Sequence, residues 1–157
     1  LPVAGSRVEA SIPRDSQRDE ELQGERIKSH EELAGLRVLM VDDDEDTLEL
    51  LSAALRQRSA DVTAVSSASA ALEAIRTSRP DVLISDIAMP GEDGYQLIKK
   101  VIALNLKPEL PAIAITAYAK EEDKQSALAA GFHRYLSKPV ELREFITAVG
   151  QAAKRNG

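Results

Sequence analysis

The sequence has no cysteine, no tryptophan and only five aromatic residues, three tyrosines and two phenylalanines. Without cysteine it can form no disulfide, no thiolate metal site and no cysteine-based nucleophile. It also lacks any apolar run close to the roughly 18 residues that cross a bilayer, and it has no signal-peptide pattern. We therefore expect a cytoplasmic protein without direct membrane contact.

The chain also has no excess of positive charge. It contains 20 Lys and Arg residues against 26 Asp and Glu residues, a net charge of −6. The part up to residue 35 has 5 basic and 8 acidic residues and the rest has 15 and 18, so each part contributes −3. Neither part has the basic surface typical of nucleic-acid binding, so we exclude nucleic acid as a direct partner. The apolar content of 43% is that of an ordinary globular protein.

A change of pattern near residue 36 divides the chain. Residues 1–35 hold few large apolar side chains and are rich in Glu, Arg, Ser and Gln, which favours a linker that is disordered or partly helical. The alternative is a short helix over 19–33, for which Leu22, Ile27 and Leu33 supply a thin apolar stripe. We expect a folded domain over 36–153 and a short tail over 154–157.

From residue 37 onward, short aliphatic runs alternate with segments of helical period. The runs predict strands at 37–41, 61–65, 81–85, 111–116 and 132–136. The segments between them, and one after the last, predict helices, of which the one over 121–130 ends at Gly131. Five βα units predict an α/β protein with a parallel sheet that is covered by helices on both faces.

Polar residues occur where the predicted strands end. They are Asp42 and Asp43 after the first strand, Asp86 after the third, Thr116 after the fourth and Lys138 after the fifth. In doubly wound sheets the carboxyl ends of the strands form the ligand-binding edge, so the five side chains are expected to gather there.

The chemistry of this set points to a magnesium site with a reactive carboxylate. Crowded carboxylates stay ionised only if they share a cation, and Mg²⁺ prefers oxygen ligands, among them carboxylates and phosphate oxygens. Asp86 can attack phosphorus as a carboxylate nucleophile. The Lys138 ammonium and the Thr116 hydroxyl can then stabilise the charge on the transferred phosphoryl group.

Four stretches closely resemble the response-regulator receiver domain of two-component signalling. They are Val38–Asp44, Asp81–Gly94, Ile113–Ala117 and Tyr135–Pro139. The resemblance covers about residues 36–153. It implies a flavodoxin-like, doubly wound (βα)5 sandwich with the strand order 2-1-3-4-5, and a phosphoacceptor function in a phosphorelay.

The resemblance also implies a role for each residue of the metal and acceptor site. Asp86 is then the phosphoacceptor and a metal ligand. Asp43 binds Mg²⁺ directly, Asp42 acts on the metal mostly through water, and the Ala88 carbonyl is the backbone ligand.

Further roles implied by the resemblance concern the read-out. Lys138 pairs with the acceptor and later with its phosphate, and Thr116 and Tyr135 form a switch pair. The Lys138–Pro139 peptide bond is expected to be cis. Tyr118, two residues after Thr116, is expected to shield the acyl phosphate from water and to slow its hydrolysis.

Several acids have simpler interpretations. Asp44, Glu45 and Asp46 suit the first turn of a helix, where the helix dipole favours negative charge. Asp81 precedes its strand and therefore lies at the opposite end of the sheet, where we expect a structural role.

The resemblance extends to partners and context. The phosphodonor is expected to be a histidine kinase or a histidine phosphotransfer protein, and the output surface to be the helix over 121–130, the last strand and the last helix, through which the domain can also form a homodimer. Leu1–Ala4 looks like the closing strand of a kinase ATP-binding domain. This favours the C-terminal receiver of a hybrid histidine kinase, whose parent chain can be membrane-attached.

Two other functions remain open at this stage. One is a receiver-like binding module that works without phosphorylation, against which the complete acidic set argues. The other is a haloacid-dehalogenase-type phosphohydrolase, whose signature Asp44–Leu48 echoes loosely. That signature needs a glycine that is missing here, and Asp42 rather than Asp44 stands at the strand end.

Overall fold

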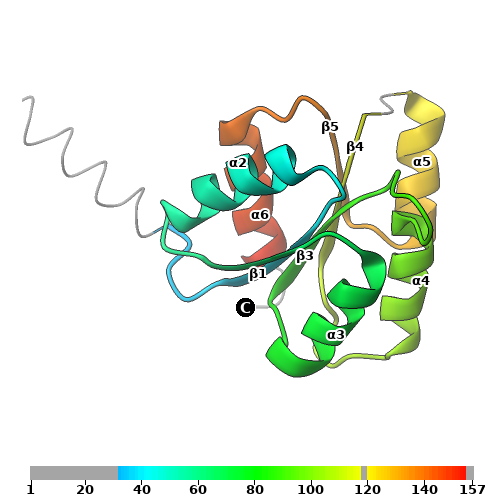
Figure 1. Cartoon of the computed structure of the whole chain (residues 1–157), viewed down its shortest axis with the longest axis horizontal. Helices are drawn as coiled ribbons and strands as arrows, with labels where there is room; N and C mark the ends of the chain where they lie inside the picture. Colours follow the sequence, from blue (N-terminus) through cyan, green and yellow to red (C-terminus); the bar gives the residue numbers. More distant parts are fainter. Residues whose placement is uncertain (1–31, 118–119, 155–157) are drawn as a thin grey trace, which may run out of the picture.

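The computed structural model describes residues 32–117 and 120–154, which form a single α/β domain (Figure 1). Its elements follow one another as β1 (Arg37–Val41), α2 (Glu45–Arg56), β2 (Asp61–Val65), α3 (Ala68–Ser78), β3 (Val82–Asp86), α4 (Gly94–Ala103), β4 (Ala112–Thr116), α5 (Glu121–Ala130), β5 (Arg134–Ser137) and α6 (Leu142–Lys154). The strands form one parallel sheet in the order β2-β1-β3-β4-β5. The predicted flavodoxin-like fold is therefore confirmed.

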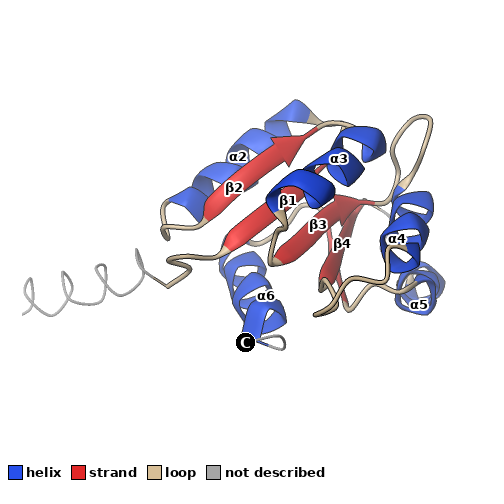
Figure 2. Cartoon of the chain, turned by 90° about the horizontal axis from the view of Figure 1, so that it is seen from below, coloured by secondary structure: helices blue, strands red, loops and turns tan. Residues whose placement is uncertain are grey.

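Helices cover both faces of the sheet, and each face has its own apolar core. One core joins β-strand side chains to α2 and α6, with Leu55 and Phe145 fully buried in it. The other joins the opposite face to α3, α4 and α5 and includes Ile75 and Leu97. Figure 2 shows the strands side by side between these helices. β3 and β4 are buried at every position, as expected for parallel strands covered on both sides.

Side-chain caps fix where the helices near the carboxyl ends of the strands begin. Asp44 caps α2, because its carboxylate accepts hydrogen bonds from the Asp46 amide at 3.1 Å and the Thr47 hydroxyl at 2.8 Å. Asp93 and Gln96 form a reciprocal capping box at the start of α4. The helix-capping interpretation of Asp44 is thus confirmed. The two caps fix where the loops that follow β1 and β3 end.

Three predicted strands begin later than expected, among them β4, which begins at Ala112 and not at Pro111. β3 begins at Val82 because the Asp81 carboxylate instead accepts a hydrogen bond from the Arg37 amide at 2.8 Å. This contact, at the amino end of the sheet, confirms the structural role of Asp81. β5 begins at Arg134 because Phe132 still closes α5, donating its amide to the Ala127 carbonyl at 3.1 Å.

Packing of the domain reaches back to Leu33, which is 3% exposed and belongs to the core that α2 and α6 share. Its amide donates to the Arg58 carbonyl at 3.0 Å. The predicted helix over 19–33 lies almost wholly outside the described residues, as does most of the predicted linker. In the described part of the chain, no helix combines the length and the apolar character that crossing a membrane requires.

Candidate phosphoryl-transfer site

The fold brings the five predicted site residues to one edge of the sheet. Asp42 follows β1 directly, Asp86 and Thr116 are the last residues of β3 and β4, and Lys138 follows β5. The strand order reverses between β1 and β3, which are neighbours in the sheet. Asp42 and Asp86 therefore flank the point at which doubly wound sheets bind their ligands.

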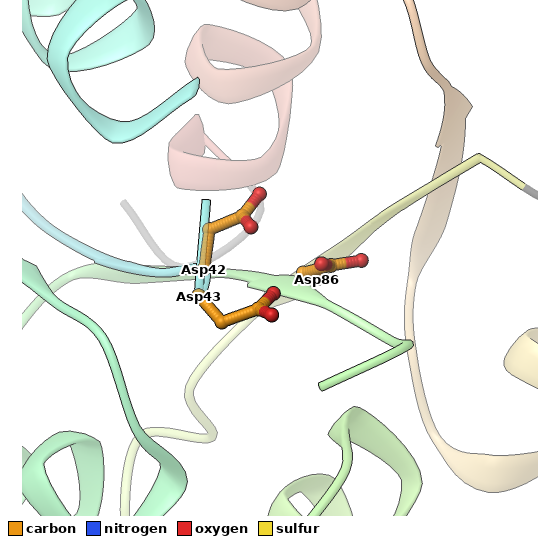
Figure 3. Close-up of side chains that lie close together, drawn as sticks. All are labelled: Asp42, Asp43 and Asp86. Carbon is orange, nitrogen blue, oxygen red and sulfur yellow. The ribbon is translucent and has the colours of Figure 1, made fainter. Parts of the chain in front are cut away.

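Three carboxylates meet at this point. Asp42, Asp43 and Asp86 each place a carboxylate oxygen within 4.8 Å of the others, as Figure 3 shows. Asp42 is 2% exposed and Asp86 5% exposed, whereas Asp43 is exposed to solvent. The cluster is thus open to solvent at Asp43 and buried at Asp42 and Asp86.

Lys138 balances part of this negative charge. Its ammonium nitrogen lies 2.9 Å from Asp42 Oδ2 and 3.5 Å from Asp86 Oδ2. Burial alone would lower the pKa of Lys138, but its hydrogen bond to Asp42 and the charges of both acids raise it overall. The expected pairing with Asp86 is present, although the closer partner is Asp42. The Lys138–Pro139 bond that follows is cis, as the resemblance implied.

Asp86 is a carboxylate that its surroundings make reluctant to ionise. Burial raises its pKa to about 6, and the negative charge of Asp42 adds to this effect, while Lys138 opposes it. The group therefore needs more positive charge nearby than Lys138 alone supplies.

Backbone amides orient the two buried acids. The Asp44 amide donates to Asp42 Oδ1 at 2.9 Å, and the Ala88 amide donates to Asp86 Oδ1 at 3.3 Å. The other oxygen of each carboxylate, Oδ2, is the one that Lys138 contacts.

The donor set fits a divalent cation of the magnesium type. It consists of carboxylate oxygens, which are the hard ligands that Mg²⁺ prefers, and it lies on an open edge where water and phosphate oxygens can complete the coordination. No Cys or His belongs to the cluster, which disfavours the softer site of zinc or copper.

The predicted switch residues lie on neighbouring strands, Thr116 at the end of β4 and Tyr135 within β5. Thr116 is 1% exposed. The Tyr135 hydroxyl is buried without a hydrogen-bond partner among the described residues, and burial, followed by the charge of Asp123, raises its pKa. Tyr118 falls outside the described residues, so its predicted shielding role stays a prediction.

A cavity of about 320 Å³ opens between the residues that follow β3 and the starts of α4 and α5. Its lining consists of Ile87, Ala88, Asp93, Tyr95, Thr116 and Asp123. The sequence had given no role to Tyr95 or Asp123, since each reads as an ordinary residue in the first turn of a helix. They line the same cavity as Thr116 because α4 and α5 begin close to the end of β4 in the folded domain, which the sequence does not indicate.

Comparisons with known proteins agree with this geometry. The sequence model of the response regulator receiver domain matches residues 38–150. The uncharacterized 14.6 kDa protein in the sodA1 3′ region of Leptolyngbya boryana is 48% identical over 119 residues, which are 76% of this chain and 91% of that protein.

A longer relative contains the domain as a small part. The hybrid signal transduction histidine kinase D of Dictyostelium discoideum is 34% identical over 125 residues, which are 74% of this chain but only 8% of the kinase. Among solved structures, the receiver domain of the Francisella response regulator 1452 is 30% identical, with a TM-score of 0.73. That match covers 78% of this chain and 100% of the Francisella chain. This chain therefore belongs to the response regulator receiver domain family.

Proposed function

We propose that the domain accepts a phosphoryl group on Asp86 from a phosphohistidine, in a reaction that requires Mg²⁺, and so acts as a receiver in a two-component phosphorelay. The observation that carries this proposal is the buried Asp86 carboxylate, which lies among two further acids and Lys138 at the carboxyl edge of the sheet. A purely structural ion pair would need one acid rather than three.

The chain's own residues divide the work of the transfer. An oxygen of Asp86 forms a bond to phosphorus while the bond between phosphorus and the donor imidazole nitrogen breaks, and the imidazole takes up a proton. Asp42, Asp43, Asp86 and the Ala88 carbonyl would hold Mg²⁺, and the ion would supply positive charge to the phosphoryl oxygens. Lys138, 3.5 Å from Asp86, is placed to pair with the phosphate that replaces the free carboxylate.

Phosphorylation would be read out through the elements next to the site. The Thr116 hydroxyl turns toward the phosphate, and the Tyr135 ring moves toward the space that it leaves. The Tyr135 hydroxyl supports this role, because it is buried and has no hydrogen-bond partner in the part of the chain that the structure describes, which costs about 1–3 kcal/mol. The changed surface consists of α5, β5 and α6, through which a partner or a second copy of the domain binds.

The donor in this proposal is a histidine kinase or a histidine phosphotransfer protein. We further propose that the domain works in the cytoplasm as the receiver of a hybrid histidine kinase, which the match to such a kinase supports. The coding sequence upstream of Leu1 tests this context. A histidine-bearing helix and a glycine-rich ATP lid would support it, and their absence would leave another kind of receiver protein.

Acetyl phosphate, a small donor that needs no kinase, tests the central reaction. With Mg²⁺ present, the protein should gain one phosphate by intact mass, and Asp86→Ala should gain none. Asp81→Ala is the matched control, because Asp81 directly precedes β3 at the opposite end of the sheet and contacts Arg37 instead.

Two results would contradict the proposal. Labelling that persists in Asp86→Ala would exclude Asp86 as the acceptor. Turnover of a simple phosphate ester that is lost in Asp44→Ala and kept in Asp86→Ala would favour a phosphohydrolase instead.

A further inference from the structure

The backbone carbonyl of Asp86 lies beyond the last residue pair between β3 and its neighbour β1. The register between β1 and β3 stops at the pair Val41 and Ser85, one residue before Asp86. On the other side the register with β4 continues, since Asp86 pairs with Ile115, and the Ile87 amide donates to the Ile115 carbonyl at 3.2 Å. The register with β1 thus ends one residue before Asp86, whereas the register with β4 includes it.

A buried hydroxyl takes the place of strand pairing on the β1 side. Ser85 Oγ donates to the Asp86 carbonyl oxygen at 2.8 Å, and Ser85 is 0% exposed. It is the one hydroxyl in a strand whose preceding residues, Val82 to Ile84, are all aliphatic. Because burying a hydroxyl is unfavourable unless it is hydrogen-bonded, this bond fixes both Ser85 and the carbonyl that it contacts.

The start of α4 confines the same carbonyl from another direction. A Cβ atom on Gly94 would lie 2.5 Å from the Asp86 carbonyl oxygen and 2.7 Å from Ile87 Cα. Gly94 does not have a positive φ, so its backbone conformation does not demand glycine. Its amide donates to the Ile87 carbonyl at 2.9 Å. The missing side chain therefore allows the close approach of α4 to the acceptor peptide.

We propose that Ser85 and Gly94 are positioning residues for phosphoryl transfer, which fix the Asp86 peptide and thereby aim its carboxylate. The inference rests on the proposed function of Asp86. Neither residue contacts the reacting group, and each acts through the Asp86 backbone. A displacement of the nucleophile by a fraction of an ångström lowers the rate of the chemical step without changing the affinity for the donor.

The test compares two variants with matched controls in the full chain, using acetyl phosphate at saturating Mg²⁺. Ser85→Ala is compared with Ser52→Ala, an equally buried serine whose hydroxyl lies 3.6 Å from the Met40 sulfur. Gly94→Ala is compared with Gly150→Ala in α6, where the new Cβ would meet only Leu33 Cδ2, at 3.8 Å. The measured quantities are the maximal rate of labelling and the half-saturating acetyl phosphate concentration.

We expect Ser85→Ala to lower the maximal rate roughly three- to tenfold and Gly94→Ala about tenfold or more, with the half-saturating concentration unchanged. Both controls should label at the rate of the unaltered protein. Ser85→Thr, which keeps the hydroxyl, should recover part of the rate. The ¹³C resonance of the Asp86 carbonyl should move upfield in Ser85→Ala, since the carbonyl loses a hydrogen bond.

Equal maximal rates in Ser85→Ala and Ser52→Ala would overturn the inference while leaving the proposed function intact. A raised half-saturating concentration with an unchanged maximal rate would overturn it as well. If Gly94→Ala does not fold, Ser85→Ala and its carbonyl resonance decide the question alone. Absence of labelling at Asp86 in the unaltered protein would instead remove the proposed function, and the inference with it.

Discussion

The two ends of the parallel sheet both gather charged residues, but in different environments. At the amino end, a cavity of about 400 Å³ is lined by charged side chains that include Arg37, Arg79, Asp81 and Lys107. The ion pair there, Arg37 with Asp81, has side chains that are 52% and 43% exposed. At the carboxyl end, the side chains of Lys138 and Asp42 are 21% and 3% exposed and lie 2.9 Å apart.

The difference shows why the volume of a cavity does not identify the functional end. Solvent screens the charges at the amino end, so the ion pair between Arg37 and Asp81 contributes little to the stability of the fold. At the carboxyl end two buried acids, Asp42 and Asp86, share one lysine beside a third acid, and burial raises the pKa of Asp86 to about 6. An incompletely compensated charge cluster of this kind is a candidate functional site, which is why the proposal places the chemistry at this end of the sheet.

The largest expected effect comes from removing the metal or its exposed ligand. Asp43→Asn should lower the rate of labelling by acetyl phosphate about a hundredfold, because it removes stabilisation of charge in the transition state. Chelation of divalent cations by EDTA should stop labelling. Asp44→Asn is the control, since Asp44 caps α2, and it should keep most of the rate. If both variants lost the labelling rate equally, the negative charge of this edge as a whole, and not a specific metal ligand, would control the reaction.

The two kinds of ion pair can be compared directly through lysine. Lys138→Met should lower the free energy of unfolding by roughly 3–5 kcal/mol at neutral pH without Mg²⁺, because it leaves buried carboxylates unpaired. Lys100→Met removes the partner of the more exposed Glu92, and should cost at most about 1 kcal/mol. Urea titrations measure both values. Similar losses would contradict the contrast between a screened and an unscreened pair.

The pH dependence of stability tests the raised pKa of Asp86. Because the folded-state pKa is about 6 and the ordinary value is 3.8, the folded state holds a proton that the unfolded state releases between these values. The protein should therefore lose stability relative to Asp86→Asn as the pH rises from about 4 to 6, by up to about 3 kcal/mol, since one pKa unit is about 1.4 kcal/mol. Above pH 6 the gap should stay constant. Urea titrations in EDTA at each pH measure it, and a gap that is independent of pH would contradict the burial argument.

The smallest effect is expected at the amino end. Arg37→Ala should change the free energy of unfolding by about 1 kcal/mol or less, because the pair with Asp81 is half exposed. It should leave the labelling rate unchanged. A loss of labelling in this variant would show that the two ends of the sheet are coupled.

Most of the fold could be predicted because the parallel sheet leaves a strong pattern in the sequence. β1 and β2 begin and end where the aliphatic runs do. β3 begins later because the Asp81 side chain makes a tertiary contact with Arg37, which no period of the sequence encodes. β5 begins later because the Phe132 amide still makes a local bond that closes α5. The burial of Leu33 against α6 also depends on the folded arrangement alone.

The site was predictable as a set of residues, and less so in its pairings. Strand ends place Asp42, Asp86 and Lys138 on one edge whatever their side chains do. That Lys138 lies closer to Asp42, at 2.9 Å, than to Asp86, at 3.5 Å, depends on a difference too small for a sequence pattern to predict. The hydrogen bond from Ser85 to the Asp86 carbonyl could not be predicted from the sequence either, because a serine in an apolar strand does not indicate which atom accepts its hydrogen bond.

The most direct test of the account is to locate the phosphate itself. After reaction with acetyl phosphate and Mg²⁺, borohydride reduces an acyl phosphate and leaves homoserine at the phosphorylated aspartate. Peptide mapping by mass spectrometry should find homoserine at residue 86 and at no other aspartate. Homoserine at residue 42 or 43, or none at all, would contradict the central claim that Asp86 is the phosphoacceptor.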